Sequence, residues 1–240
     1  MQEKNLLILG ASSDLGIAFL RTEIKGYDYV IAHYCSNVAP LLQLKQEYPE
    51  KLCLKKADFS KRDEIEQFVR EIFQEGKIPV YLVHFSAVKC KLRRFDKIPY
   101  EEFQTCLQVS VNSILLILQS LLPHMVRQHY GKIVFVLSIH TITGPHKYIS
   151  DYMMAKFALL SLMESLTAEY RDKGIRMNSI SPDTIETKFI SELPELSIEN
   201  KKNSNATRKL LDVSSIVPTI AYLLNKKSDG LYGQNIGITS

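Results

Sequence analysis

Short apolar runs recur along the chain and are separated by longer segments with helical periodicity. After the first run, for example, Leu15, Ala18 and Phe19 fall at the spacing of one helix face. Strands alternating with helices predict an α/β fold in a single domain over residues 1–240, with one parallel sheet wound on both faces. The predicted strands span roughly residues 5–9, 28–34, 51–56, 79–85, 132–138, 175–181 and 235–238.

One stretch is apolar enough to suggest a membrane span. Residues 103–126 contain no Asp, Glu, Lys or Arg and are long enough to cross a bilayer. Polar residues such as Gln108 and Asn112 interrupt the stretch, and each would be costly in lipid. We therefore expect no membrane contact and a long helix packed between the sheet and a partner subunit. Long apolar helices over about 101–129 and 150–173 predict a homo-oligomer.

The composition changes near the C-terminal third, where residues 190–209 are rich in Glu, Lys, Asn and Ser. Such a segment is typical of a mobile flap over a site or of a solvated surface loop, and composition alone favours the loop. Between these two interpretations we expect the flap, as a substrate flap at about 188–212.

Composition and charge exclude several classes of function. The net charge is +4 without a long basic run, so nucleic-acid binding is not indicated. The four cysteines show no CxxC spacing and no secretory leader precedes the first strand, which predicts reduced thiols in a cytoplasmic protein. The six histidines form no metal-binding pattern, so we expect no metal site.

A glycine-containing turn joins the first predicted strand to the first helix. In dinucleotide-binding folds, a unit of strand, glycine-containing turn and helix places backbone N–H groups and the positive end of the helix against a pyrophosphate. The alternative is an ordinary strand-to-helix turn in which Ser13 or Asp14 caps the helix. The residues that the first interpretation assigns to a dinucleotide are Gly10, Ser12, Ser13, Asp14, Leu15 and Gly16.

Tyr152 and Lys156 lie four residues apart and would share one face of a helix. A nearby ammonium favours the phenolate, so we expect Lys156 to lower the pKa of Tyr152 and fit it for proton transfer. The same spacing occurs in Tyr222 and Lys226, where nothing else suggests chemistry. The surrounding motifs must distinguish the two pairs.

In their joint order these features resemble the short-chain dehydrogenase/reductase family, whose fold is a Rossmann-type sheet, over nearly the whole chain. Ala57-Asp58-Phe59 is similar to the family's adenine-contacting turn, and Leu82 to Ala87 occupies the place of its Asn-Asn-Ala-Gly motif, with the asparagines and glycine replaced. Asn178 to Asp183 and Thr187 resemble the segment whose threonine holds the nicotinamide carboxamide. The further cofactor contacts that this resemblance implies are Asp58, Phe59, Ser86, Ala87, Tyr152, Lys156, Pro182 and Thr187.

The resemblance also implies four catalytic residues. Ser138 and Tyr152 would hydrogen-bond the substrate carbonyl oxygen while hydride arrives, and Tyr152 would give up its proton. Lys156 would bind the ribose hydroxyls of the cofactor. Asn112 would be the family's structural asparagine and would help hold water that resupplies the proton.

Two departures from the family pattern affect the site. Asp14 stands where the family has a small residue, and its carboxylate would repel a pyrophosphate unless it turns back to cap the helix. The interval from Ser138 to Tyr152 is one residue longer than usual in the family. Thr141 or Thr143 is therefore an alternative source of the catalytic hydroxyl.

Cofactor choice follows from the end of the second strand, His33 to Asn37. An acidic residue there would bind the 2′-hydroxyl of NAD and repel a 2′-phosphate, and none is present. We therefore expect NADP(H) to be favoured over NAD(H), with Ser36, Asn37 and His33 as donors to the phosphate.

The nearest subfamily in appearance is the 3-oxoacyl-acyl-carrier-protein reductases, which implies reduction of a 3-oxoacyl thioester or a related small ketone. The substrate would be small or bound to an acidic acyl carrier protein, and the family commonly forms tetramers or dimers. Two alternatives remain, a non-catalytic dinucleotide-binding scaffold of this fold and a sugar or polyol dehydrogenase. Basic residues that would dock a carrier, or form solvated loops, are Lys89, Lys91, Arg93, Arg94, Arg127, His129, Arg171 and Lys173.

Overall fold

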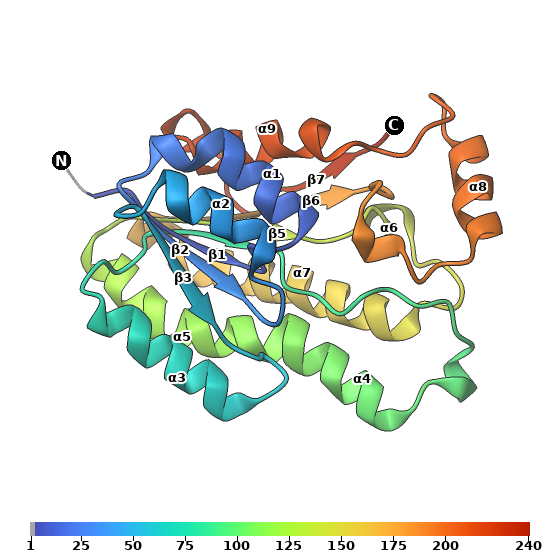
Figure 1. Ribbon diagram of the computed structural model, residues 1–240, viewed down its shortest axis with the longest axis horizontal. Coiled ribbons are helices and arrows are strands. Elements are labelled where there is room, and N and C mark those ends of the chain that lie inside the picture. The colour runs from blue at the N-terminus through green and yellow to red at the C-terminus, as the bar shows by residue number, and fades with distance from the viewer. Residues whose placement is uncertain (1–2) are drawn as a thin grey trace.

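The computed structural model of the protein describes residues 3–240 and contains a seven-stranded, fully parallel sheet between two layers of helices (Figure 1). The strand order β3-β2-β1-β4-β5-β6-β7 confirms the predicted doubly wound sheet, and every strand boundary lies within two residues of its predicted position. The strands are β1 Asn5–Leu9, β2 Tyr29–Tyr34, β3 Leu52–Lys56, β4 Tyr81–His84, β5 Gly131–Val136, β6 Ile175–Pro182 and β7 Asn235–Ile238.

Two buried apolar clusters, one on each face, hold the helices to the sheet. The helices α1, α2 and α9 pack on one face, and α3, α5 and α7 pack on the other. The helices are α1 Asp14–Glu23, α2 Ala39–Glu47, α3 Arg62–Gln74, α4 Tyr100–Leu107, α5 Ser113–Arg127, α6 His140–Thr143, α7 Ser150–Tyr170, α8 Glu195–Ser204 and α9 Val213–Leu224.

The order of the strands reverses at β1, which pairs with β2 on one side and β4 on the other. The carboxyl ends of all seven parallel strands lie at one edge, and ligands of such sheets bind in the crevice at this reversal. The glycine turn after β1 and the ends of β4, β5 and β6 therefore lie close to one another.

The apolar stretch forms two helices and not one. Helix α4 and helix α5 are joined by a π-helical turn at Gln108–Asn112, and together they are the one helical stretch in residues 3–240 whose length and hydropathy would suit a membrane span. Ile114, Ile117 and Leu121 of α5 are fully buried in the cluster under β4 and β5. This packing makes α5 a core helix of the domain.

The segment at 188–212 lies at the edge of the fold, where α8 stands apart from the sheet (orange in Figure 1). The backbone of Ile185 forms an isolated parallel bridge with Leu211, which closes the segment into a loop. Its inner side carries Phe189 and Leu193, which pack against Tyr152 and Cys90. The segment thus covers part of the sheet edge.

Candidate active site

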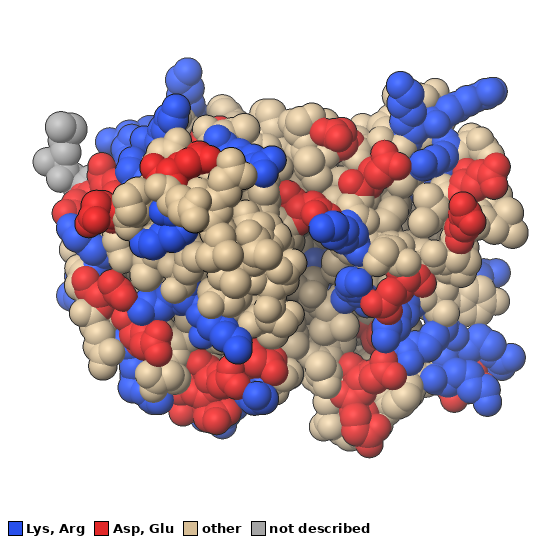
Figure 2. Space-filling model, in the orientation of Figure 1, with Lys and Arg blue, Asp and Glu red and all other residues tan. Residues whose placement is uncertain are grey.

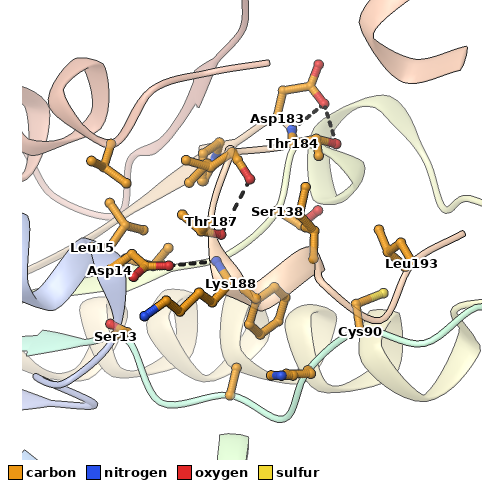
Figure 3. Close-up of a pocket in the computed structure, with 18 of the residues that line it drawn as sticks. Ser13, Asp14, Leu15, Cys90, Ser138, Asp183, Thr184, Thr187, Lys188 and Leu193 are labelled. Carbon is orange, nitrogen blue, oxygen red and sulfur yellow. Dashed lines mark hydrogen bonds between the residues drawn. The ribbon is translucent and has the colours of Figure 1, made fainter. Parts of the chain in front are cut away.

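A cavity of about 990 Å³ opens at the carboxyl edge of the sheet. The face shown in Figure 2 is hollowed near its centre, and Figure 3 shows residues from the glycine turn, β5 and the 188–212 segment around the same space. The predicted site residues that line it are Ser12, Ser13, Asp14, Leu15, Asn37, Ala87, Ser138, Tyr152, Lys156, Pro182 and Thr187.

Two glycines shape the turn without lining the cavity. Gly10 has a φ of +77°, and a Cβ atom there would lie 3.0 Å from the backbone nitrogen of Ser86. A Cβ on Gly16 would lie 2.5 Å from the carbonyl oxygen of Ala11. Both positions therefore require glycine, because a side chain would push the turn away from its neighbours.

The helix after this turn presents free donors to the cavity. Ser13 is the N-cap residue of α1, and its hydroxyl accepts a hydrogen bond from the N–H of Gly16 at 3.1 Å. The N–H groups of Asp14 and Leu15 have no acceptor among residues 3–240. Free N–H groups at a helix N-terminus fit an anion such as a pyrophosphate.

His33 does not face the cavity, and its expected contact with a phosphate is wrong. Its Nδ1 accepts the N–H of Gly10 at 3.0 Å, so its Nε2 carries the proton and donates to the carbonyl of Ala57 at 3.0 Å. Burial lowers the pKa of His33 to about 4 and keeps the ring neutral. The ring joins the glycine turn to the turn after β3 and supports the shape of the site.

The turn after β3 has little free polar surface. The Phe59 ring is buried and stacks on His33 with ring centroids 3.8 Å apart. The Asp58 carboxylate accepts hydrogen bonds from the N–H and hydroxyl of Ser60. Asp58, Phe59 and the exposed Ser36 do not line the cavity, so their predicted contacts with the cofactor rest on the sequence alone.

Lys156 is buried, and among residues 3–240 its ammonium hydrogen-bonds the main chain and not the hydroxyl of Tyr152. Its Nζ donates to the carbonyl of Val136 at 2.7 Å and lies 5.4 Å from the centroid of the Tyr152 ring. Burial raises the pKa of Tyr152, and the neighbouring Ser138 hydroxyl only partly opposes it. The expected lowering of this pKa by Lys156 is therefore wrong for the protein without ligands, because burial raises the pKa and the Ser138 hydroxyl, not the Lys156 ammonium, is the group that opposes the rise.

These protonation states suit a proton donor. A phenol with a raised pKa stays neutral and holds the proton that a carbonyl oxygen needs on reduction. Burial lowers the pKa of Lys156 to about 8, close to neutrality. Tyr222 of the second Tyr-Lys pair lies on α9, is 46% exposed and does not line the cavity, so position separates the two pairs.

Among the candidate hydroxyls, Ser138 has the position expected of the catalytic one. It is buried at the end of β5 and lines the cavity. The Thr141 hydroxyl donates to the carbonyl of Ser138 at 2.8 Å, and the Thr143 hydroxyl donates to the carbonyl of Ile139 at 3.2 Å. The longer loop is taken up by α6 and by Gly144, whose φ is +98°.

Asn112 is not brought to the cavity. Its side chain is exposed, and its Nδ2 donates to the Oε1 of Gln108 at 2.9 Å. The π-helical turn instead buries Ser110, whose carbonyl accepts the Nε2 proton of buried His84 at 2.9 Å. The proton-relay role predicted for Asn112 thus has no support in its position.

Sequence reasoning missed His84 as a residue of this region. Among residues 3–240 its Nδ1 has no hydrogen-bond partner although the ring is buried, and the same is true of the hydroxyl of Ser86. Burial lowers the pKa of His84 to about 3, so the ring is neutral. The signal in the sequence was the motif at 84–87, where the family's asparagines are replaced, which indicates that this part of the site differs from that of the family.

An apolar wall stands beside Tyr152. It consists of Cys90, Leu92, Ile149, Phe189 and Leu193, which pack with Tyr152 and line the cavity. The five residues come from three separate segments, so no local pattern identified them. An apolar wall of this kind favours a substrate with an apolar part.

The basic residues after β4, Lys89, Lys91, Arg93 and Arg94, all form ion pairs with acidic side chains. Lys89 and Lys91 both pair with Glu192 of the 188–212 segment, at 3.4 and 3.5 Å. Arg93 and Arg94 pair with Glu102 and Asp96. The cluster therefore presents much less positive charge than its sequence suggests.

Asp14 does not cap its helix, because Ser13 does. The Oδ2 atom of Asp14 instead accepts the backbone N–H of Lys188 at 2.6 Å, across the cavity (Figure 3). The cavity's remaining acid, Asp183, pairs with Lys201 at 2.8 Å.

No group of three or more metal-ligating side chains occurs in residues 3–240, and the four cysteines are free thiols.

Comparisons with known proteins agree with this geometry. The profile of a family described as Enoyl-(Acyl carrier protein) reductase matches residues 11–239. The 3-oxoacyl-[acyl-carrier-protein] reductase of Thermotoga maritima is 25% identical over 241 residues, covering 99% of this chain and 97% of that protein.

Solved structures show the same fold. Levodione reductase superposes with a TM-score of 0.88 at 22% identity, covering 98% of this chain and 96% of the other. ElxO with NADP bound superposes with a TM-score of 0.85 at 18% identity, covering 99% of this chain and 97% of the other. Fold, site and family profile together show that the chain is an oxidoreductase of the short-chain dehydrogenase/reductase family.

Proposed function

We propose that the protein is an NADP(H)-dependent reductase that converts the carbonyl of a 3-oxoacyl thioester, or of a related small ketone, to a hydroxyl. The observation that carries this proposal is the convergence of Ser138, Tyr152 and Lys156 with the free N–H groups of the glycine turn on one cavity. A dinucleotide fits there, because the turn offers an anion site and both glycines keep it open.

Each residue has a distinct task in this proposal. The nicotinamide cofactor, when bound, supplies the hydride. Ser138 and Tyr152 donate hydrogen bonds to the carbonyl oxygen, and Tyr152 then gives its proton to that oxygen. Lys156 holds the ribose and returns a proton to Tyr152. Thr187 and Pro182 orient the nicotinamide end of the cofactor, since both line the cavity beside Ser138.

The preference for NADP(H) rests on the end of β2, where no acidic residue follows the strand. Asn37 lines the cavity and is the donor available to a 2′-phosphate, while His33 is committed to Gly10 and Ala57. The solved ElxO structure with NADP bound has the same fold.

The substrate class rests on the relative from Thermotoga maritima and on the apolar wall, which suits an acyl chain or an apolar ring. The same wall weighs against the sugar or polyol alternative, because hydroxyl groups would lose water there without gaining partners. Docking of an acidic carrier protein would have to exchange the ion pairs made by Glu192 and Glu102. We place the enzyme in the cytoplasm as a homo-oligomer.

The test is a fluorescence titration of the purified protein with NADPH and, separately, with NADH, followed by NADPH oxidation with 3-oxoacyl thioesters and small apolar ketones. We expect tighter binding of NADPH and turnover of at least one of these substrates. Preference for NADH would contradict the cofactor assignment alone. Binding of neither nucleotide would favour the non-catalytic scaffold.

A further inference from the structure

We propose that Asp14 and Lys188 form a clasp over the cofactor's phosphates. In this clasp the Asp14 carboxylate holds the Thr187–Ile190 segment against the glycine turn, and the Lys188 ammonium supplies the positive charge that the turn lacks. The inference rests on the proposed function, because it requires that the cavity bind a nicotinamide dinucleotide. The ligand chemistry addressed is the pyrophosphate shared by NADPH and NADH.

The first half of the clasp is a single long-range hydrogen bond. Asp14 and Lys188 are 174 residues apart in sequence, and the carboxylate accepts the backbone N–H of Lys188 at 2.6 Å. Both residues line the cavity, Asp14 from the start of α1 and Lys188 from the segment just after Thr187. The bond therefore joins the two sides of the crevice where the phosphates are expected.

The second half is the Lys188 side chain. Figure 3 shows it extending from the 188–212 segment across the site toward Ser13, with its ammonium at the glycine turn. Within residues 3–240 this ammonium has neither an acidic partner nor a hydrogen-bond acceptor, whereas Lys201 pairs with Asp183 and Lys202 with Glu186. Lys188 is thus a cation of the segment that remains available to an anion.

Charge balance makes this arrangement useful. The glycine turn itself carries no basic residue, and Asp14 places a negative charge beside the free N–H groups of α1. A pyrophosphate bound there would be repelled by Asp14 at short range. The Lys188 ammonium offsets that repulsion, and the Asp14 carboxylate in turn keeps Lys188 in place, so the acidic departure in the turn and the distant lysine act together.

The two halves are separable by mutation, because the bond to Asp14 uses the main chain of Lys188. Lys188→Gln removes the charge and keeps the N–H that Asp14 accepts. Lys202→Gln is the matched control, since it removes the same charge from the same segment but from a lysine that pairs with Glu186 and does not line the cavity. Asp14→Ala releases the segment and keeps the ammonium.

The experiment is equilibrium binding of NADPH and NADH to the full-length protein and each variant, over a series of salt concentrations. We expect Lys188→Gln to weaken binding of both nucleotides about tenfold, as loss of one phosphate ion pair predicts. Its affinity should also depend less on salt than that of the wild type, while Lys202→Gln should bind as the wild type does. Limited trypsin digestion should cut Asp14→Ala faster after Lys188.

The outcomes separate this inference from the proposed function. Binding of both nucleotides by Lys188→Gln within twofold of the wild type, with an unchanged salt dependence, would overturn the inference and leave the proposed function intact. Failure of the wild-type protein to bind either nucleotide would overturn both. Weaker binding of NADPH with unchanged binding of NADH would also overturn the inference, because that result would place Lys188 at the 2′-phosphate.

Discussion

At the scale of single residues, burial decides the protonation of the proposed catalytic pair, Tyr152 and Lys156. The four-residue spacing correctly places Tyr152 and Lys156 on one helix face, but it does not show how deeply α7 lies in the protein. Removal from water raises the pKa of Tyr152 and lowers that of Lys156. Both shifts disfavour charge, which is the usual result of desolvation.

Replacing Tyr152 with phenylalanine tests the proposed proton donor. The variant keeps the ring and its contact with Phe189 but loses the hydroxyl, so we expect turnover to fall by about 10²–10⁴-fold. NADPH affinity, measured by fluorescence titration, should change little. Tyr222→Phe is the control and should turn over like the wild type; turnover of Tyr152→Phe within a few-fold of the wild type would rule out this mechanism.

The buried Lys156 should leave a signature in the pH dependence of stability. Its folded pKa is about 8 and its ordinary value is 10.5, so between these values the unfolded chain holds a proton that the folded protein has released. The contribution of Lys156 to the free energy of unfolding therefore rises with pH across this window, by about 3 kcal/mol in total. Below pH 8 both states hold the proton, so this contribution does not change with pH there.

Lys156→Met lacks this titration, so its free energy of unfolding should rise less than that of the wild type between pH 8 and 10.5. Urea unfolding at several pH values measures both curves, and the difference between them cancels the other titrating groups. Parallel curves for the two proteins would show that Lys156 titrates at its ordinary pKa in the folded state.

At the scale of elements, the π-helical turn between α4 and α5 marks where regular periodicity fails. It frees the carbonyl of Ser110 to accept the Nε2 proton of His84, and it turns Asn112 outward. Apolar spacing could not reveal one extra residue in a helix, so the sequence predicted a continuous helix there. The His84–Ser110 hydrogen bond joins the end of β4 to this turn.

The variant His84→Phe tests whether the hydrogen bond from His84 to the carbonyl of Ser110 stabilises the fold. It leaves the buried carbonyl of Ser110 without a donor, which should lower the free energy of unfolding by about 1–3 kcal/mol. His84→Gln should recover part of the loss, because its amide can donate. Urea unfolding at pH 7 measures both, with His146→Phe at an exposed position as control. Equal stability of His84→Phe and the wild type would show that the hydrogen bond contributes nothing.

At the scale of the whole molecule, the surface combines paired charges beside the cavity with exposed apolar side chains on α7. Ion pairs neutralise most of the basic cluster beside the cavity, so the surface there is mixed in sign (Figure 2). Apolar side chains remain outside the sheet, with Met154 and Phe157 on α7 being 47% and 40% exposed. A neighbouring subunit on α7 would remove this surface from water.

We expect the wild-type protein to be a dimer or tetramer and the double variant Met154→Lys, Phe157→Glu to shift toward monomer. Charges on that face would oppose burial between subunits and leave the fold of one subunit intact. Light scattering after gel filtration at micromolar concentration gives the mass. Tyr222→Lys, on α9, is the control for an exposed aromatic residue elsewhere and should keep the wild-type mass. A monomeric wild type would contradict the assembly.

The sequence by itself determined the elements and the local motifs. Strand and helix periodicity, the glycines at 10 and 16 and the order of the motifs are properties of neighbouring residues, so they identify the parallel sheet, the glycine turn and the family. The position of Ser138 also follows, because it comes directly after the strand β5, whose carboxyl end must lie at the common edge.

Only the tertiary structure decided how the site is assembled. It joins Asp14 to Lys188, turns His33 away from the cavity, builds an apolar wall from three segments and pairs Lys89 and Lys91 with Glu192. It also reverses the expected pKa shift of Tyr152. The physical reason is common to all of these: contacts between distant segments, and the removal of water that they cause, depend on how the layers pack and leave no periodic signal along the chain.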